Sequence, residues 1–236
     1  MPGSVRGVDH QPQPALSDAM REGSRLEHEE AEASPFVSDL VGGRARPAQY
    51  AAYLRRLRVV YAALEDAVRD RREHPAVAGV HDDALARTDA LEADLAHWAP
   101  GREPAVASRA AEAYRARIDA ARLRPHLLVA HHYTRYLGDL SGGRVLAQAL
   151  RREYADQGLD SAGLAFYDFP EIPKPVPYKR DYRDRLDALP LSDADRAEVV
   201  EEVRRAFRLN RDLFAEVADP HVDAETDAEL SGALDR

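Results

Sequence analysis

Apolar side chains recur every three to four residues through most of the chain, which is the spacing of one face of a helix. No run of β-branched residues alternates with polar ones, as a half-buried strand would require. The pattern predicts helices over residues 17–41, 47–68, 82–98, 108–123, 125–154, 179–189 and 192–217. We therefore expect an all-α fold, with six to eight helices in a single domain.

Turn-forming residues mark the ends of several of these helices. Gly42 and Gly43 end the first one, because glycine readily adopts the conformation that closes a helix. Residues 167–177 contain four prolines, which forbid a helix there and predict an extended loop. Ser192, followed three residues later by Asp195, has the pattern of a capping box and predicts the start of the last helix.

The predicted helix over residues 125–154 contains three glycines within six residues, Gly138, Gly142 and Gly143. Each interior glycine costs a helix about 1 kcal/mol relative to alanine, so their presence needs a reason. Gly138 and Gly142 are four residues apart and share one helix face. Without side chains, that face lets the backbone closely approach something flat. Asp139 lies beside this bare strip, and the helix is expected to bend at its glycines.

Composition narrows the functional classes. The chain has 44% hydrophobic and 32% charged residues, as an ordinary globular protein does. It has no cysteine, which excludes disulfides, zinc–thiolate sites and cysteine nucleophiles. Its formal net charge of −9 argues against a nucleic-acid partner. Local basic clusters, one at Arg21 and Arg25 and one around Lys179 and Arg183, still allow an anionic small ligand.

The ends of the chain give expectations about its organisation. The first residues lack the apolar run of a signal peptide, and no window approaches 18 consecutive apolar residues. We therefore expect a cytoplasmic protein that does not interact with membranes. The expected organisation is a disordered segment at 1–15, one domain over 16–217 and a flexible acidic tail at 218–236.

Two stretches resemble a known family. Residues 127–146, LLVAHHYTRYLGDLSGGRVL, resemble the signature helix of the haem oxygenases, and AFRLNRDLF near the C-terminus matches a second segment of that family. The resemblance covers roughly residues 16–217. It implies a fold in which haem lies between the first, proximal helix and a glycine-kinked distal helix. It also implies the reaction: haem, O2 and external electrons give biliverdin, CO and Fe2+, with opening of the ring at a meso carbon, expected to be the α position.

The first predicted helix carries Arg21, Arg25, His28 and Glu32 at positions i, i+4, i+7 and i+11, which place them on one face. By itself this pattern is typical of a solvated charged stripe. The family resemblance favours a different interpretation. His28 would ligate the haem iron, Glu32 would orient its imidazole, and the two arginines would meet the haem propionates.

On the distal side, the resemblance implies that the backbone at Gly138 and Gly142 directs oxygen toward the ring edge, and that Asp139 orders water for proton delivery. Without the motif, Asp139 would be interpreted as a buried carboxylate paired with an arginine. The expected catalytic residues are Asp139, Gly138, Arg135, Tyr61 and Asn210. The expected haem contacts are Arg21, Arg25, Glu32, Tyr133, Thr134, Gly138, Ser141, Gly142, Lys179, Arg183, Phe207 and Phe214.

Some positions depart from the family pattern. Arg144 stands where glutamine is common, His132 replaces a small residue, and Arg21 and Arg25 stand where lysines are common. Adjacent histidines on a helix point about 100° apart, so His131 and His132 do not easily ligate one ion. We expect structural roles for both.

The implied cofactor is haem b, which is also the substrate, together with O2. The chain has no flavin or nicotinamide fingerprint, so a separate ferredoxin or flavoprotein reductase is expected to supply electrons to a monomeric enzyme. One alternative, a di-iron carboxylate bundle, needs paired Glu-x-x-His motifs, which the sequence lacks. A haem-binding protein without turnover, for transport or sensing, remains the stronger alternative, because His28 and the propionate contacts would serve both functions.

Overall fold

The computed structural model describes residues 13–101, 106–156 and 162–219, and within these ranges it is helical without strands. The α-helices are α1 (Leu16–Gly23), α2 (Arg25–Glu32), α3 (Pro35–Val41), α4 (Pro47–Asp70), α5 (Pro75–Ala78), α6 (Thr88–Trp98), α7 (Arg109–Ala121), α8 (Leu128–His132), α9 (Arg144–Asp156), α10 (Pro175–Asp187) and α11 (Asp193–Val217). The all-α expectation is confirmed. The expected terminal segments, 1–15 and 218–236, fall almost entirely outside the described residues.

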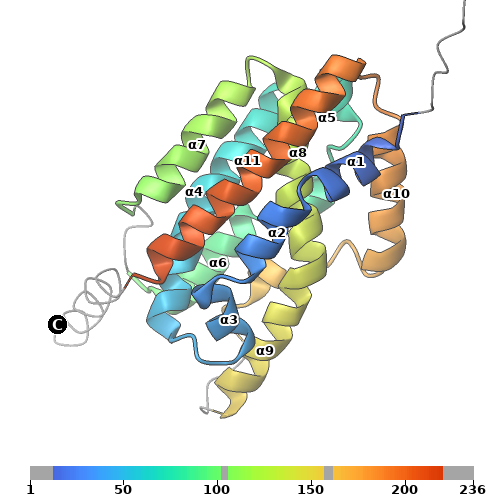
Figure 1. Cartoon of the computed structure of the whole chain (residues 1–236). Helices are drawn as coiled ribbons and strands as arrows, with labels where there is room; N and C mark the ends of the chain where they lie inside the picture. Colours follow the sequence, from blue (N-terminus) through green and yellow to red (C-terminus); the bar gives the residue numbers. More distant parts are fainter. Residues whose placement is uncertain (1–12, 102–105, 157–161, 220–236) are drawn as a thin grey trace, which may run out of the picture.

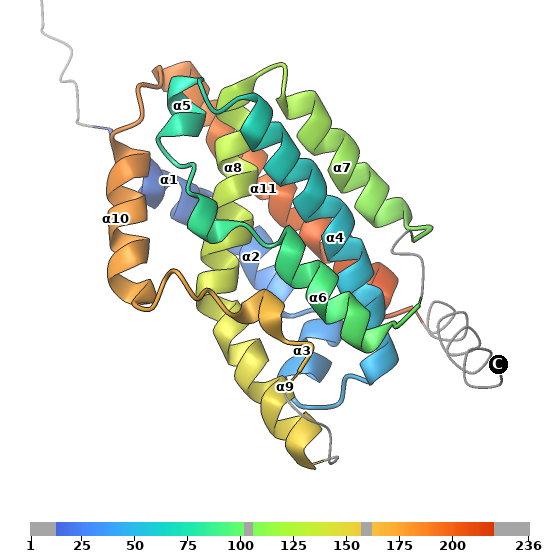
Figure 2. The ribbon, with the colours of Figure 1, turned by 180° about the vertical axis from the view of Figure 1, so that it is seen from behind.

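The helices α4 and α11, the longest of the α-helices named above, form the centre of the molecule. They pack against each other and against α7 and α8, and their apolar stripes fill the core. In Figure 1, α2 lies on the near face, alongside α11. In Figure 2, seen from behind, α6 lies on the near face and packs on α4. No helix in the described part of the chain has both the length and the apolar character that a membrane crossing requires.

The first predicted helix, 17–41, is wrong as a continuous element. The structure breaks it at Ser24, whose φ of −111° and ψ of 12° depart from helical values, and again before α3. The second break has a local cause: Pro35 occupies the first position of α3, and Ser34 caps it by accepting a hydrogen bond from the backbone of Val37 at 3.4 Å. The helix count is consequently higher than six to eight.

The other helix ends follow the expected signals with two exceptions. Gly42 caps α3, and Gly43 adopts φ of +67°, while the capping box of Ser192 and Asp195 opens α11. The expected loop over 167–177 is too long, because α10 begins at Pro175, where the missing proline N–H has no helical partner to lose. The helix expected from residue 82 begins only at Thr88, after a 3-10 turn at Asp83–Leu85.

The expected bend in the glycine-bearing helix takes a specific form. Between α8 and α9 the backbone is π-helical over Tyr133–Leu137 and Asp139–Gly143. Such segments are rare in proteins, and those that occur are often found at functional sites. We use the term distal helix for residues 128–156, which comprise α8, the two π-helical segments and α9. The distal helix lies beside α2 in both views of the ribbon, and both pack on α11.

Candidate active site

The glycines of the distal helix divide into two kinds. Gly138 and Gly142 are exposed, and a Cβ added to either would meet no atom within 4 Å. Gly143 is buried, and its added Cβ would lie 3.1 Å from the ring of Tyr167. Gly138 and Gly142 therefore border open space, whereas Gly143 allows close packing inside the protein.

Asp139 lies next to this open strip at the centre of a buried polar network. Tyr61, from α4, donates a hydrogen bond to Asp139 Oδ2. Arg135 donates from Nε to the Tyr61 hydroxyl at 3.1 Å, and its Nη2 lies 3.5 Å from Asp139 Oδ1. From α11, Asn210 Oδ1 accepts a hydrogen bond from Arg135 Nη1 at 2.7 Å. The structure thus brings together four of the expected catalytic residues.

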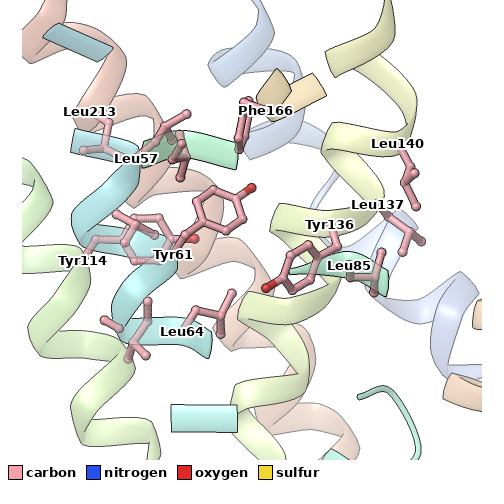
Figure 3. Close-up of a cluster of buried hydrophobic side chains, with 14 of the residues drawn as sticks. Leu57, Tyr61, Leu64, Leu85, Tyr114, Tyr136, Leu137, Leu140, Phe166 and Leu213 are labelled. Carbon is pink, nitrogen blue, oxygen red and sulfur yellow. The ribbon is translucent and has the colours of Figure 1, made fainter. Parts of the chain in front are cut away.

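The network is enclosed by aromatic and apolar side chains. Tyr61 and Tyr136 face each other edge-on, with ring centroids 5.7 Å apart, and Phe166 closes on Tyr61 at 5.4 Å (Figure 3). This burial raises the pKa of Asp139, although the charge of Arg135 and the hydrogen bond from Tyr61 oppose the rise. Asp139 is therefore a carboxylate that accepts a proton more readily than an exposed one.

Arg87, which no sequence pattern indicated, also belongs to this environment. It is buried, its guanidinium lies 3.9 Å from the ring centroid of Phe169, and it donates to backbone carbonyls that include Ala86 at 2.6 Å. Its charge also acts to lower the pKa of Asp139. No periodic pattern or motif marks Arg87, which precedes α6, so only the folded chain shows that it lies near Asp139.

His28, the expected ligand, lies on α2 with about half of its side chain exposed. Glu32 Oε1 is 3.6 Å from His28 Nε2, and the ring of Phe207 packs edge-on against the imidazole at 5.0 Å. Phe214, two turns further along α11, packs instead with Phe36 and Tyr53. His28 thus has a nearby carboxylate, at the position expected for Glu32, and an aromatic neighbour that the sequence pattern did not predict beside it.

The single face expected for the first helix is not formed as such. The break at Ser24 puts Arg21 on α1 and leaves Arg25 with His28 and Glu32 on α2. Arg21 pairs with Asp18 at 3.1 Å, and Arg25 pairs with its helix neighbour Glu29 at 2.7 Å. These pairs are exposed, and exposed pairs contribute little free energy, so both arginines can readily turn toward another anion.

The second basic cluster meets the distal helix. Lys179, on α10, donates to Ser141 Oγ at 2.8 Å, and Arg183 lies one turn further along the same helix. Burial lowers the pKa of Lys179, and the positive charges of Arg183 and Arg144 lower it further. Cations gathered in this way favour an anionic partner.

Tyr133 and Thr134 stand at the start of the π-helical region. Burial raises the pKa of the Tyr133 phenol, while the charges of Arg183 and Arg21 oppose that rise, so both basic clusters approach this side chain. Thr134 is buried, and its hydroxyl has no hydrogen-bond partner within the described residues.

Both adjacent histidines have structural contacts. His131 Nε2 lies 2.9 Å from Glu202, which also pairs with Arg117, and His132 Nδ1 lies 2.7 Å from the Tyr182 hydroxyl. Burial lowers the pKa of His132 to about 3, so this ring is neutral near pH 7. The expectation of structural roles is consistent with these contacts.

The sequence of this chain is similar to those of known proteins. Residues 14–216 match the family model described as "Heme oxygenase". "Heme oxygenase" of Porphyra purpurea is 38% identical over 209 residues, which cover 86% of each chain. "Heme oxygenase 1" of Homo sapiens is 37% identical over 206 residues, which are 86% of this chain and 71% of the human protein.

A solved structure extends the match to three dimensions. The crystal structure of heme oxygenase-1 from the cyanobacterium Synechocystis sp. PCC6803, in complex with heme, superposes with a TM-score of 0.83 at 31% identity. The match covers 94% of this chain and all of that chain. The chain therefore belongs to the haem oxygenase family of haem-degrading enzymes.

Proposed function

We propose that this enzyme holds haem b between α2 and the distal helix, with His28 as the iron ligand, and opens the ring at its α-meso carbon. The single observation that carries the proposal is the open strip at Gly138 and Gly142 directly beside the buried Asp139 network. A flat ligand fits against a helix face that lacks side chains. Haem supplies the iron that binds O2, and the products are biliverdin, CO and Fe2+.

The residues around the strip match the chemistry of haem. The half-exposed imidazole of His28 offers a nitrogen ligand, and Glu32, at 3.6 Å, is placed to orient it. Lys179 and Arg183, with Arg21 and Tyr133 near them, offer cations and a phenol to the propionates. We assign the four residues that face the propionates, together with Arg25, to holding the ring in one rotation about its normal.

Asp139 is assigned to proton delivery through an ordered water molecule. One of its oxygens accepts the Tyr61 hydrogen bond, while the other, 3.5 Å from Arg135, is beyond an ordinary hydrogen-bond distance. That second oxygen remains available to accept a hydrogen bond from water. Asn210 acts through Arg135, which it holds at 2.7 Å, and is a positioning residue.

We further propose that electrons come from a separate ferredoxin or flavoprotein reductase, and that the enzyme acts as a cytoplasmic monomer. Turnover with each donor class, measured at equal concentration, identifies which one this enzyme accepts. Size-exclusion chromatography with light scattering of the haem-bound protein tests the monomer.

The proposed ligand is tested by mixing purified protein with one equivalent of haemin and adding ascorbate in air. Decay of the Soret band into the broad red absorbance of biliverdin means turnover, and an unchanged band means haem storage. His28→Ala is expected to bind haem, to lose the histidine-ligated spectrum and most activity, and to recover part of both with added imidazole. His97→Ala, at an exposed histidine away from the site, is the control. Wild-type spectrum and rate in His28→Ala would exclude His28 as the ligand.

A further inference from the structure

A second group of potential ligands lies away from the candidate active site, where the turn before α8 meets the start of α11. His126 belongs to the 3-10 turn Pro125–Leu127, and Asp195 and Glu198 lie in the first two turns of α11. His126 Nε2 is 2.9 Å from Glu198 Oε2 and 3.7 Å from Asp195 Oδ1. One ligand atom from each of the three residues lies within 4.8 Å of the other two.

These spacings suit a small divalent cation. Ligand atoms bound to Zn2+ at about 2.1 Å in a tetrahedral site lie about 3.4 Å apart. The separations of 2.9 and 3.7 Å fall on either side of that value, so small side-chain adjustments would complete the geometry. One imidazole and two carboxylates are borderline donors that take zinc and neighbouring first-row metals.

Asp195 has more capacity to accept than helix capping uses. Asp195 Oδ2 accepts hydrogen bonds from the Ser192 backbone at 3.2 Å and from the Ser192 hydroxyl at 2.6 Å. Its other oxygen, Oδ1, is the one near His126. Capping therefore occupies one oxygen of Asp195 and leaves the second for a metal.

The state of His126 also suits ligation. Only 12% of its side chain is exposed, and this burial lowers the pKa of the imidazole despite the neighbouring carboxylate of Asp195. The neutral ring is the form that donates a lone pair to a metal. Arg124, whose side chain is half exposed, contacts Glu198. Its guanidinium supplies the positive charge beside that carboxylate.

We propose that His126, Asp195 and Glu198 form a site for a divalent first-row transition metal, with Zn2+ as the probe ion, and that Arg124 competes with the metal for Glu198. The site joins the turn that leads into the distal helix to the start of α11, the helix that carries Asn210. Metal binding would therefore stabilise the docking of two helices that build the active site, without contacting the haem.

The test is isothermal titration of the full-length, haem-loaded protein with Zn2+, so that His28 is already occupied by haem. Wild-type protein is expected to bind one Zn2+ ion. His126→Gln is expected to bind this ion more weakly, with a Kd at least about tenfold higher than that of wild type. Glu198→Gln is expected to do the same and serves as the second variant if His126→Gln folds poorly. His97→Gln, at an exposed histidine, is the matched control and should bind as wild type does.

Arg124→Gln separates a metal site from ordinary ion pairing. If Arg124 competes for Glu198, removing it lowers the Kd for Zn2+ several-fold, and Zn2+ raises the melting temperature of this variant more than that of wild type. Equal Zn2+ binding by wild type and His126→Gln, no binding by wild type, or no change in Kd in Arg124→Gln would each overturn the proposal.

Discussion

Replacing both glycines of the open strip should make this enzyme more stable and less active. Gly138 has φ of −60° and ψ of −49°, which alanine adopts without strain, and a Cβ at Gly138 or Gly142 meets nothing within 4 Å. Alanine is favoured over glycine in a helix interior by about 0.5–1 kcal/mol. For Gly138→Ala with Gly142→Ala, the haem-free protein should therefore gain about 1–2 kcal/mol in the free energy of unfolding.

The same two methyl groups occupy the face on which we place haem. They should hold the ring away from the distal backbone, weaken haem binding and reduce biliverdin formation. The assay is a pair of measurements: thermal unfolding without haem, where each kcal/mol shifts Tm by about 2–4 °C in a domain of this size, and haem turnover followed at the Soret band. Gly143→Ala is the control, because its methyl would press on Tyr167 at 3.1 Å and should lower stability.

Two results would refute this reasoning. A less stable haem-free double variant would mean that the strip is packed against protein atoms. Turnover at the wild-type rate would mean that the strip does not face the ring, and the proposed haem position would be wrong.

Three further predictions concern charged groups of the site and the core. Asp139→Asn leaves Arg135 without its buried counter-charge, so thermal melts should show that the free energy of unfolding falls by up to about 3–5 kcal/mol. Among the molecules that remain folded, biliverdin formation should fall sharply while phenol oxidation with H2O2 rises. An unchanged rate of biliverdin formation would exclude the proton-delivery role. Lys179→Ala with Arg183→Ala should give a mixture of biliverdin isomers by chromatography, and a single isomer would place the propionate contacts elsewhere. Burial raises the pKa of Glu202, but the hydrogen bonds from its partners outweigh this and lower it from 4.5 to about 2. The stability from this ionised group is complete above pH 4.5 and is lost as the pH falls toward 2, so Glu202→Gln should flatten the acid limb of a Tm-against-pH curve.

The sequence by itself determined the fold class and the position of the main motif. Helical periodicity is a local property, so the stripe of α4 and the capping box of Ser192 could be identified without any tertiary information. The cost of interior glycines likewise pointed to an open face at Gly138 and Gly142. The family resemblance then linked Asp139 to Tyr61, 78 positions earlier in the chain, which no local pattern connects.

Tertiary structure alone decided how the helices break and which distant groups meet. Whether a helix continues past Ser24, or becomes π-helical beside its glycines, depends on packing energies that exceed the small differences in local propensity. Arg87 approaches Asp139, and His126 meets the start of α11, only because helices distant in sequence pack together. Charges and hydrogen bonds act through space, so these meetings follow from the packed arrangement of helices and have no signature along the chain.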